Sequence, residues 1–378
     1  MDMLTIILKN IWHKKIRTIL TILGISVSIS AYVALIGLTN GLEDSIKITY
    51  AERGTDLIVL EKGVVDILSS NVDGSYVQKI KAIPDIKEAA PILLNLYSLS
   101  SKTYILLYGW DFNSYLCREL KVDGRIPSAD NEVILGQLAA QRLGKKNGDE
   151  VAFKGQKFIV AGIFQSKSLL ENGAVVMSIK KLQEIKGVPG KITALNLKVR
   201  LSDASEETPE KLEARIEAAR LKIEKLFPEL EAKNVQAFMT TNTPLFLVKN
   251  FTWAISLVAF LIVVLGILNT MTMSVLERTR EIGILRAMGW RTFRILLLVL
   301  VEAGILGALG GAGGIFLGYG LMNFLVATPQ LHGFMGVAYD KVLISQVAVS
   351  SLLLGIGSGI YPAIKAVSID PIKVLRHE

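Results

Sequence analysis

The sequence of 378 residues contains one cysteine, Cys117, and three histidines, His13, His332 and His377. A single cysteine cannot form a disulfide within the chain, so a disulfide-stabilised scaffold is excluded. We expect Cys117 to fill apolar space and not to act as a reactive thiol. The histidines are scattered along the sequence and do not suggest a metal site.

The sequence also lacks the nucleotide-binding motif G-x-x-x-x-G-K-[ST]. In that motif, backbone amides and a lysine hold the phosphates. The glycine-rich stretch GALGGAGGIFLG at 307–318 has no lysine and lies in an apolar run. We therefore expect this chain to have no catalytic residues and no enzymatic activity, and to bind no cofactor or metal.

Charged residues are nearly absent from four stretches, at 18–42, 250–276, 295–327 and 342–364. About 20 apolar residues are enough to cross the ~30 Å of a bilayer's hydrocarbon. Core helices of soluble proteins are usually shorter, so the four stretches are predicted to be transmembrane helices. The first is too long for the apolar region of a cleavable signal peptide and is expected to remain as an anchor.

The net charge is +8, but residues 41–248 contain 28 Lys and Arg against 27 Asp and Glu. Most of the excess therefore lies beside the apolar stretches. Its residues are Lys9, Lys14, Lys15, Arg17, Arg278, Arg280, Arg286, Arg291, Arg294, Lys365, Lys373 and Arg376. Cytoplasmic flanks of membrane helices carry such an excess. We interpret it as a signal of topology and not as a nucleic-acid-binding surface.

These observations predict an α-helical membrane protein with four transmembrane helices and a large mixed α/β extracytoplasmic domain inserted between helices 1 and 2. Residues 1–17, 277–294 and 365–378 are expected in the cytoplasm. Residues 43–249 and the loop 328–341 are expected outside. Both termini of this multi-pass protein would then be cytoplasmic.

Apolar runs within the extracytoplasmic domain predict strands at 57–60, 103–109, 132–135, 157–164, 174–177 and 193–199. Helices are predicted at 76–83, 137–143 and 179–186, and after Thr208 as the N-cap with Pro209 in the first helical position. Short strands separated by turn sequences at about 120–190 indicate a β-rich subdomain inserted in the α/β domain.

Glycines recur four residues apart in the third and fourth apolar stretches. They are Gly307, Gly310, Gly311, Gly314, Gly318, Gly355 and Gly359. This spacing lets membrane helices approach each other closely. We expect these glycines to pack transmembrane helices together, including at an interface between two copies of the chain.

A short charged segment, ERTREIGILRAMGWR, separates the second and third apolar stretches. Ile282, Leu285 and Met288 are three residues apart and would form an apolar stripe on a helix, with charged residues beside it. Such a helix could lie along the membrane interface. It could equally insert its apolar side into a groove of a partner protein. The pattern alone does not separate these two interpretations.

This segment at 277–291 closely resembles the cytoplasmic signature of the MacB/FtsX-type permeases of ABC transporters. The resemblance extends to TILGISVSIS with the basic residues before it, to NGLEDSIKITYAERGTDLIVL, to Glu302 with the glycines that follow, and to the ending YPAIKAVSIDPIKVLR. It therefore covers essentially the whole chain, and it is strongest at 277–291 and 361–376.

The resemblance implies that the segment is a coupling helix that docks on a separate ABC ATPase subunit, where ATP and Mg are bound. The docking residues would be Glu277, Arg278, Arg280, Glu281, Gly283, Ile284, Leu285, Arg286, Met288 and Gly289. It also implies a permease homodimer, or a heterodimer with a related permease, in the lipid bilayer of a prokaryotic plasma (inner) membrane. A periplasmic adaptor is a further partner that the resemblance leaves open, and no nucleic acid is expected.

Glu302 is an ionisable residue within the third apolar stretch, and such residues are functional candidates. It lies only about two turns into the helix. We therefore favour a structural role over proton or substrate coupling: Glu302 would reach the cytoplasmic interface or pair with Arg294.

Two functions follow from the resemblance. The leading one is export or efflux of a substrate at or outside the membrane, of the drug, peptide, haem or lipoprotein class, by a mechanical movement of the extracytoplasmic domain. The alternative is an FtsX-like transmitter that regulates cell-wall hydrolases or signals without transport. An ion channel or ion-coupled carrier is disfavoured because the apolar stretches contain almost no charge.

Overall fold

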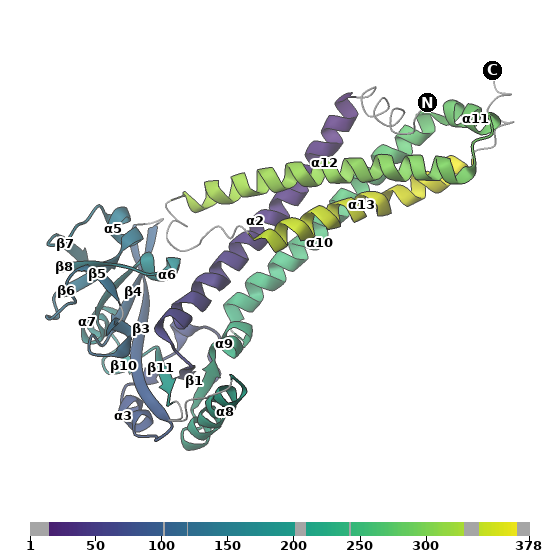
Figure 1. The fold of residues 1–378 in the computed structure, drawn as a ribbon. Coiled ribbons are helices and arrows are strands. Elements are labelled where there is room, and N and C mark those ends of the chain that lie inside the picture. The colour runs from purple at the N-terminus through teal and green to yellow at the C-terminus, as the bar shows by residue number, and fades with distance from the viewer. Residues whose placement is uncertain are drawn as a thin grey trace. The chain divides into compact units, whose positions relative to one another are not determined.

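The computed structural model describes residues 15–100, 103–118, 120–200, 209–241, 243–328 and 340–368 (Figure 1). The chain divides into two compact units. One, called here the membrane unit, contains Met1–Thr39, Asn250–Leu325 and Val337–Glu378; the other, the α/β unit, contains Asn40–Lys249 and Val326–Gly336. The predicted features at Lys14, Thr208, His332 and Lys373 lie outside the described residues.

Four helices in the described part of the chain are long and apolar enough to cross a membrane. They are α2 (Lys15–Arg53), α10 (Thr243–Glu277), α12 (Thr292–Val326) and α13 (Lys341–Val367). Three of them contain a whole predicted apolar stretch, and α12 contains the stretch 295–327 except its last residue. The largest difference from the predicted bounds is in α2, which continues past residue 42 as far as Arg53. Apolar length alone marks the membrane-crossing part of a helix, whereas the helix continues wherever packing supports it.

The α/β unit is built on a ten-stranded sheet with the order β12-β1-β11-β3-β4-β9-β6-β8-β5, in which β7 also pairs with β8. Its strands are β1 (Leu57–Glu61), β3 (Ile86–Ser100), β4 (Thr103–Trp110), β5 (Lys121–Gly124), β6 (Glu132–Gly136), β7 (Glu150–Phe153), β8 (Gln156–Gln165), β9 (Ala174–Ser178), β11 (Ala194–Val199) and β12 (Leu230–Asn234). A separate pair consists of β2 (Val72–Asp73) and β10 (Lys191–Ile192). The six predicted strands are therefore present as β1, β4, β6, β8, β9 and β11.

The predicted β-rich subdomain does not have a sheet of its own. Strands β5 to β9 come from this part of the chain, but Leu106–Trp110 of β4 pair in parallel with Ala174–Ser178 of β9. This pairing joins the two halves into one continuous sheet, so the predicted subdomain boundary is not a boundary of the sheet. Turn sequences reveal where strands end, but they do not reveal which strands pair.

The longest strand, β3, was not predicted. Its sequence, IKEAAPILLNLYSLS, contains a proline, which normally argues against a central strand because it cannot donate a ladder hydrogen bond. In the structure β3 lies between β11 and β4, with Pro91 opposite Leu195. Pairing along the rest of this long strand outweighs the one missing donor.

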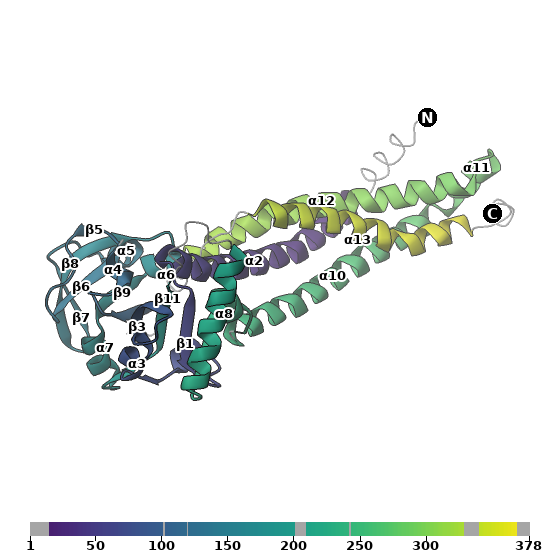
Figure 2. The same cartoon turned by 60° about the horizontal axis from the view of Figure 1, so that its bottom comes forward.

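Helices cover both faces of the sheet. They are α3 (Tyr76–Lys81), α4 (Tyr115–Arg118), α5 (Gln137–Leu143), α6 (Leu169–Asn172), α7 (Ile179–Lys186), α8 (Pro209–Leu226) and α9 (Val235–Thr241), together with the short 3-10 helix η1 (Ile67–Ser69). The helix predicted to start at Pro209 is α8, which lies beside β1 (Figure 2). Its Ala219 and Ile223 belong to one hydrophobic cluster with residues of β1 and β11. The predicted stretches 137–143 and 179–186 match α5 and α7.

Alternate residues of the strands point to opposite faces, as the strand period requires. Val175 and Met177 of β9 belong to one hydrophobic cluster, and Ala174 and Val176 belong to another. The second cluster also contains Cys117, which is 1% exposed. Burial raises the pKa of the Cys117 thiol to about 12, so this residue is the apolar filler that we expected.

Candidate functional site

The predicted coupling segment forms a separate helix, α11 (Thr279–Ala287), between α10 and α12 (Figures 1 and 2). Gly289 ends it in the left-handed conformation, with φ +89°. Gly289 N donates to Arg286 O and Trp290 N donates to Leu285 O, the two bonds of a Schellman motif. A Cβ at Gly289 would meet no atom within 4 Å. This glycine is therefore required by the end of the helix and needs no approaching partner backbone to explain it.

Side chains of the segment hold it to three other helices of the membrane unit. Arg17 of α2 donates to both carboxylate oxygens of Glu277, at 2.9 and 2.7 Å. Arg278 lies 3.2 Å from the Glu302 carboxylate of α12. Arg286 donates to the carbonyl oxygen of Val367 at the end of α13, at 3.0 Å. A displacement of α11 would therefore act on α12 and α13 directly, and on α2 through Glu277 at the adjoining end of α10.

These contacts correct the expected partner of Glu302. We expected it to reach the interface or to pair with Arg294, but its side chain is 7% exposed and its partner is Arg278. Arg294 and Glu302 are eight residues apart on one helix, which separates them by about 12 Å along the axis. Ionic pairs on a helix form three or four residues apart, so this pairing is out of reach.

The exposed side of α11 also differs from the predicted stripe. Ile282 is 4% exposed and packs in the core of the membrane unit, and Leu285 is half-buried. Met288 is 67% exposed. Residues 282 and 288 are about 120° apart around a helix, because each residue advances by about 100°. The three residues therefore do not share one exposed face.

The residues that do share an exposed face are four apart: Arg280, Ile284 and Met288. Ile284 is 42% exposed, and the exposed side chains of Arg291 and Phe293 follow soon after in the chain. We call Arg280, Ile284 and Met288 the outer face of α11. It combines apolar side chains with a positive charge at one end of the membrane unit.

The ten predicted docking residues thus fall into two groups. Glu277, Arg278 and Arg286 bond within the chain, Gly283 is buried, Leu285 is half-buried, and Gly289 ends the helix. Arg280, Glu281, Ile284 and Met288 are exposed. Helical periodicity predicted the helix, but only its packing decides which side remains open to a partner.

The glycines lie at two helix contacts inside the membrane unit. Gly310, Gly314 and Gly318 of α12 face Ile25, Ile29 and Val33 of α2, and Gly307 faces Gly355 of α13. Gly311 faces Ser351, and Gly359 faces Ala303. These contacts lie within one chain, and the expected contact between two copies stays a prediction.

The sequence analysis missed a buried polar cluster in the α/β unit, centred on Arg53 and Glu171. These residues are 118 positions apart, and no local pattern relates them. Among the described residues, no group of three or more His, Cys, Asp or Glu could hold a metal ion.

Two family models match the chain. The MacB-like periplasmic core domain matches residues 18–219, and the FtsX-like permease C-terminal domain matches residues 253–371. The periplasmic region of MacB from Actinobacillus actinomycetemcomitans is similar in structure, with a TM-score of 0.38 and 16% identity, over 52% of this chain and 97% of that region.

Relatives match over nearly the full chain. An uncharacterized ABC transporter permease of Methanocaldococcus jannaschii is 28% identical over 399 residues, covering 100% of this chain and 98% of its own length. The uncharacterized permease YvrN of Bacillus subtilis is 24% identical over 416 residues and 98% of each chain. The macrolide export ATP-binding/permease protein MacB of Campylobacter jejuni is 27% identical over 402 residues, covering 98% of this chain and 60% of MacB.

These matches agree with the observed architecture, in which four apolar helices carry a mixed α/β extracytoplasmic domain after the first of them. The predicted fold class is confirmed. Because the two family models together cover most of both units, the chain belongs to the MacB/FtsX-type family of ABC transporter permeases.

Proposed function

We propose that this chain is the permease subunit of a MacB-type transporter and that the outer face of α11 docks on a separate ATPase subunit. The observation that carries the proposal is the structure around α11. Its outer face presents Arg280, Ile284 and Met288, while Glu277, Arg278 and Arg286 bond to three other helices. A partner bound to the outer face would therefore pull on the whole membrane unit.

ATP and Mg bind to the ATPase subunit, and the movement that results is passed to the α/β unit to export a substrate at or outside the membrane. The match to the MacB-like periplasmic core domain supports export. Because several relatives are named as macrolide exporters, a macrolide is the first substrate to test. The permease acts as a dimer, with itself or with a related permease, and an adaptor is an additional partner in this scheme.

The alternative is an FtsX-like regulator that moves the same α/β unit without transport, which the FtsX-like match supports. Membrane vesicles containing the chain and its ATPase separate the two functions. ATP-dependent uptake of a macrolide or peptide supports export. ATP hydrolysis without uptake, together with ATP-dependent activation of a cell-wall hydrolase, supports regulation.

The charge distribution supports an orientation with α11 in the cytoplasm and the α/β unit outside. Single cysteines at Met288 and Val65, both exposed, test this orientation. An impermeant maleimide added to intact cells is expected to label Val65→Cys, and to label Met288→Cys only after permeabilisation. The natural Cys117 should add little background, because it is buried and its pKa is raised to about 12. Labelling of Met288→Cys from outside would reverse the orientation.

Docking is tested with Ile284→Asp in the outer face of α11. Truncating an anchor residue in an interface typically costs about 1 to 4 kcal/mol of binding, and a carboxylate placed in an apolar groove should cost more. Co-purification of the ATPase with the chain is expected to drop about tenfold or more, since ~1.4 kcal/mol corresponds to a factor of ten. Ile284 suits this test better than Leu285, which is half-buried in the chain's own packing.

The matched control is Leu221→Asp on α8, where the side chain is 53% exposed. It introduces the same charge in the α/β unit and should leave ATPase binding unchanged. The chain alone should not hydrolyse ATP. If Ile284→Asp binds the ATPase and supports ATP hydrolysis as well as the wild type does, α11 is not the docking site.

A further inference from the structure

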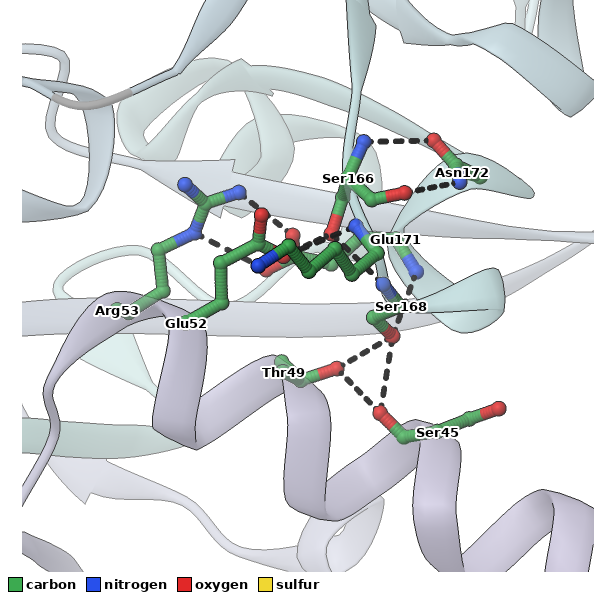
Figure 3. Close-up of polar contacts among 9 residues, drawn as sticks. Ser45, Thr49, Glu52, Arg53, Ser166, Ser168, Glu171 and Asn172 are labelled. Carbon is green, nitrogen blue, oxygen red and sulfur yellow. Dashed lines mark hydrogen bonds and ion pairs between the residues drawn. The ribbon is translucent and has the colours of Figure 1, made fainter.

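Helix α2 belongs to both units. It is one continuous helix of 39 residues, about 58 Å long at 1.5 Å per residue. Residues from Asn40 onwards belong to the α/β unit. Its last turns contact the connection between β8 and β9, which contains α6, through side chains from both segments (Figure 3).

The centre of this contact is a buried ion pair. Arg53 Nη2 lies 2.6 Å from Glu171 Oε2, and the two side chains are 4% and 1% exposed. Arg53 also lies over the ring of Trp110, 5.7 Å from its centroid. Glu171 is itself held in place, because its backbone lies in α6, whose N-cap is Ser168. Both charges are therefore paired in the interior of the α/β unit.

Hydroxyl and carboxylate groups extend the contact along about two turns of α2. Thr49 Oγ1 donates to Ser168 Oγ at 2.7 Å, and Ser168 Oγ donates to the carbonyl oxygen of Ser45 at 2.9 Å. Glu52 Oε2 accepts from Ser166 Oγ at 2.7 Å and from the backbone N–H of Lys167 at 3.0 Å. Figure 3 shows these groups meeting between the helix and the loop.

Asn172 holds the loop in the shape that these bonds need. Its Oδ1 accepts from the backbone N–H of Ser166, and its Nδ2 donates to the Ser166 carbonyl oxygen. Ser166 Oγ in turn accepts from the backbone N–H of Ser168, at 3.0 Å. Ser166, Ser168 and Asn172 are all buried. Bonds within the loop therefore hold the donors and acceptors that α2 contacts.

Such a contact differs mechanically from apolar packing. Apolar side chains can slide past each other at small cost, whereas buried hydrogen bonds and ion pairs depend steeply on distance and angle. Buried ion pairs often contribute little to stability compared with apolar residues of the same size, but they can specify one arrangement. The network therefore fixes the rotation and register of the end of α2 on the α/β unit.

We infer that Arg53 and Glu171 are positioning residues that form a rigid joint, through which α2 passes its movement to the α/β unit without slipping. This inference rests on the proposed function, because it names the contact that the ATP-driven movement must pass through. It requires that the joint stay closed throughout the cycle.

The double variant Arg53→Met/Glu171→Leu tests the need for the polar pair. Both replacements are apolar and of similar size, so the chain is expected to remain folded, with a thermal unfolding temperature close to that of the wild type. A fluorophore on Val65→Cys, which is exposed in the α/β unit, reports ATP-dependent change in that unit. The variant is expected to bind the ATPase and hydrolyse ATP, but to lose most of the ATP-dependent fluorescence change.

The control is Arg118→Met/Glu88→Leu, which removes an exposed pair from the same unit and should keep the full fluorescence change. If Arg53→Met/Glu171→Leu keeps the full change as well, the inference is wrong. If the wild-type chain does not bind an ATPase, the proposed function fails instead, so the two failures are distinguishable.

A cross-link tests whether the joint stays closed. The hydroxyl oxygens of Thr49 and Ser168 are 2.7 Å apart, so cysteines at these positions are within reach of a disulfide. In Thr49→Cys/Ser168→Cys, the oxidised and reduced forms are expected to give equal ATP-dependent fluorescence changes. A response that disappears on oxidation and returns on reduction would show that the contact opens during the cycle, and would overturn the inference.

Discussion

Alanine at Gly307 is expected to destabilise the membrane unit by about 1–3 kcal/mol or more, the usual cost of forcing extra atoms into a packed core. The new Cβ would lie 2.5 Å from the carbonyl oxygen of Ser351 and 2.9 Å from the Cα of Gly355. Both are backbone atoms, so no side chain can rotate to make room and α12 and α13 must separate. Thermal denaturation of the detergent-solubilised chain, followed by size-exclusion chromatography, measures the effect.

Gly320 provides the matched control in the same helix. A Cβ at this position would meet nothing within 4 Å, and the residue is exposed. Alanine is favoured over glycine in helices by about 1 kcal/mol, so Gly320→Ala should be neutral or slightly stabilising. Equal thermal stability of the two variants would mean that α12 and α13 are not packed as closely as Gly307 and Gly355 indicate.

Replacing Glu302 with leucine is expected to destabilise the chain by about 3 kcal/mol, at the lower end of the cost of breaking a buried ion pair. The change leaves the guanidinium of Arg278, which is 18% exposed, without its carboxylate in α12. Glu281 lies 3.5 Å from Arg278 Nε, but its side chain is 70% exposed and replaces the lost buried carboxylate only in part. The second change Arg278→Met removes the charge that has lost its buried partner. The double variant Arg278→Met/Glu302→Leu is therefore expected to recover most of the lost stability.

Arg280→Met provides the control for changing an arginine of this segment, because Arg280 is exposed on the outer face of α11. It should leave the unfolding temperature unchanged. The four unfolding temperatures, of the wild type, both single changes and the double variant, form a double-mutant cycle for Arg278 and Glu302. Additive effects in this cycle would show that the two residues do not interact.

The sequence by itself determined the features that depend on near neighbours along the chain. Apolar length marks the membrane-crossing helices, which the structure shows as α2, α10, α12 and α13. Pro209 marks the start of α8, and the local runs of apolar residues predict six of the strands. Glycines four residues apart indicate close helix approach, and the structure places Gly307 against Gly355. Each of these signals is contained in a few consecutive turns or strand residues.

Only the tertiary structure decided which segments meet. Strand β3 contradicts the local signal of Pro91, because its two neighbouring strands supply the pairing. The outer face of α11 depends on Ile282 packing inward, which the helical period alone cannot show.

The partners of buried charges depend on tertiary structure most of all. Glu302 of α12 forms an ion pair with Arg278 at the start of α11, and Arg53 forms one with Glu171, 118 residues away in the sequence. The physical reason is that a charge removed from water needs an opposite charge beside it, and two residues that are close in space can be far apart in the sequence.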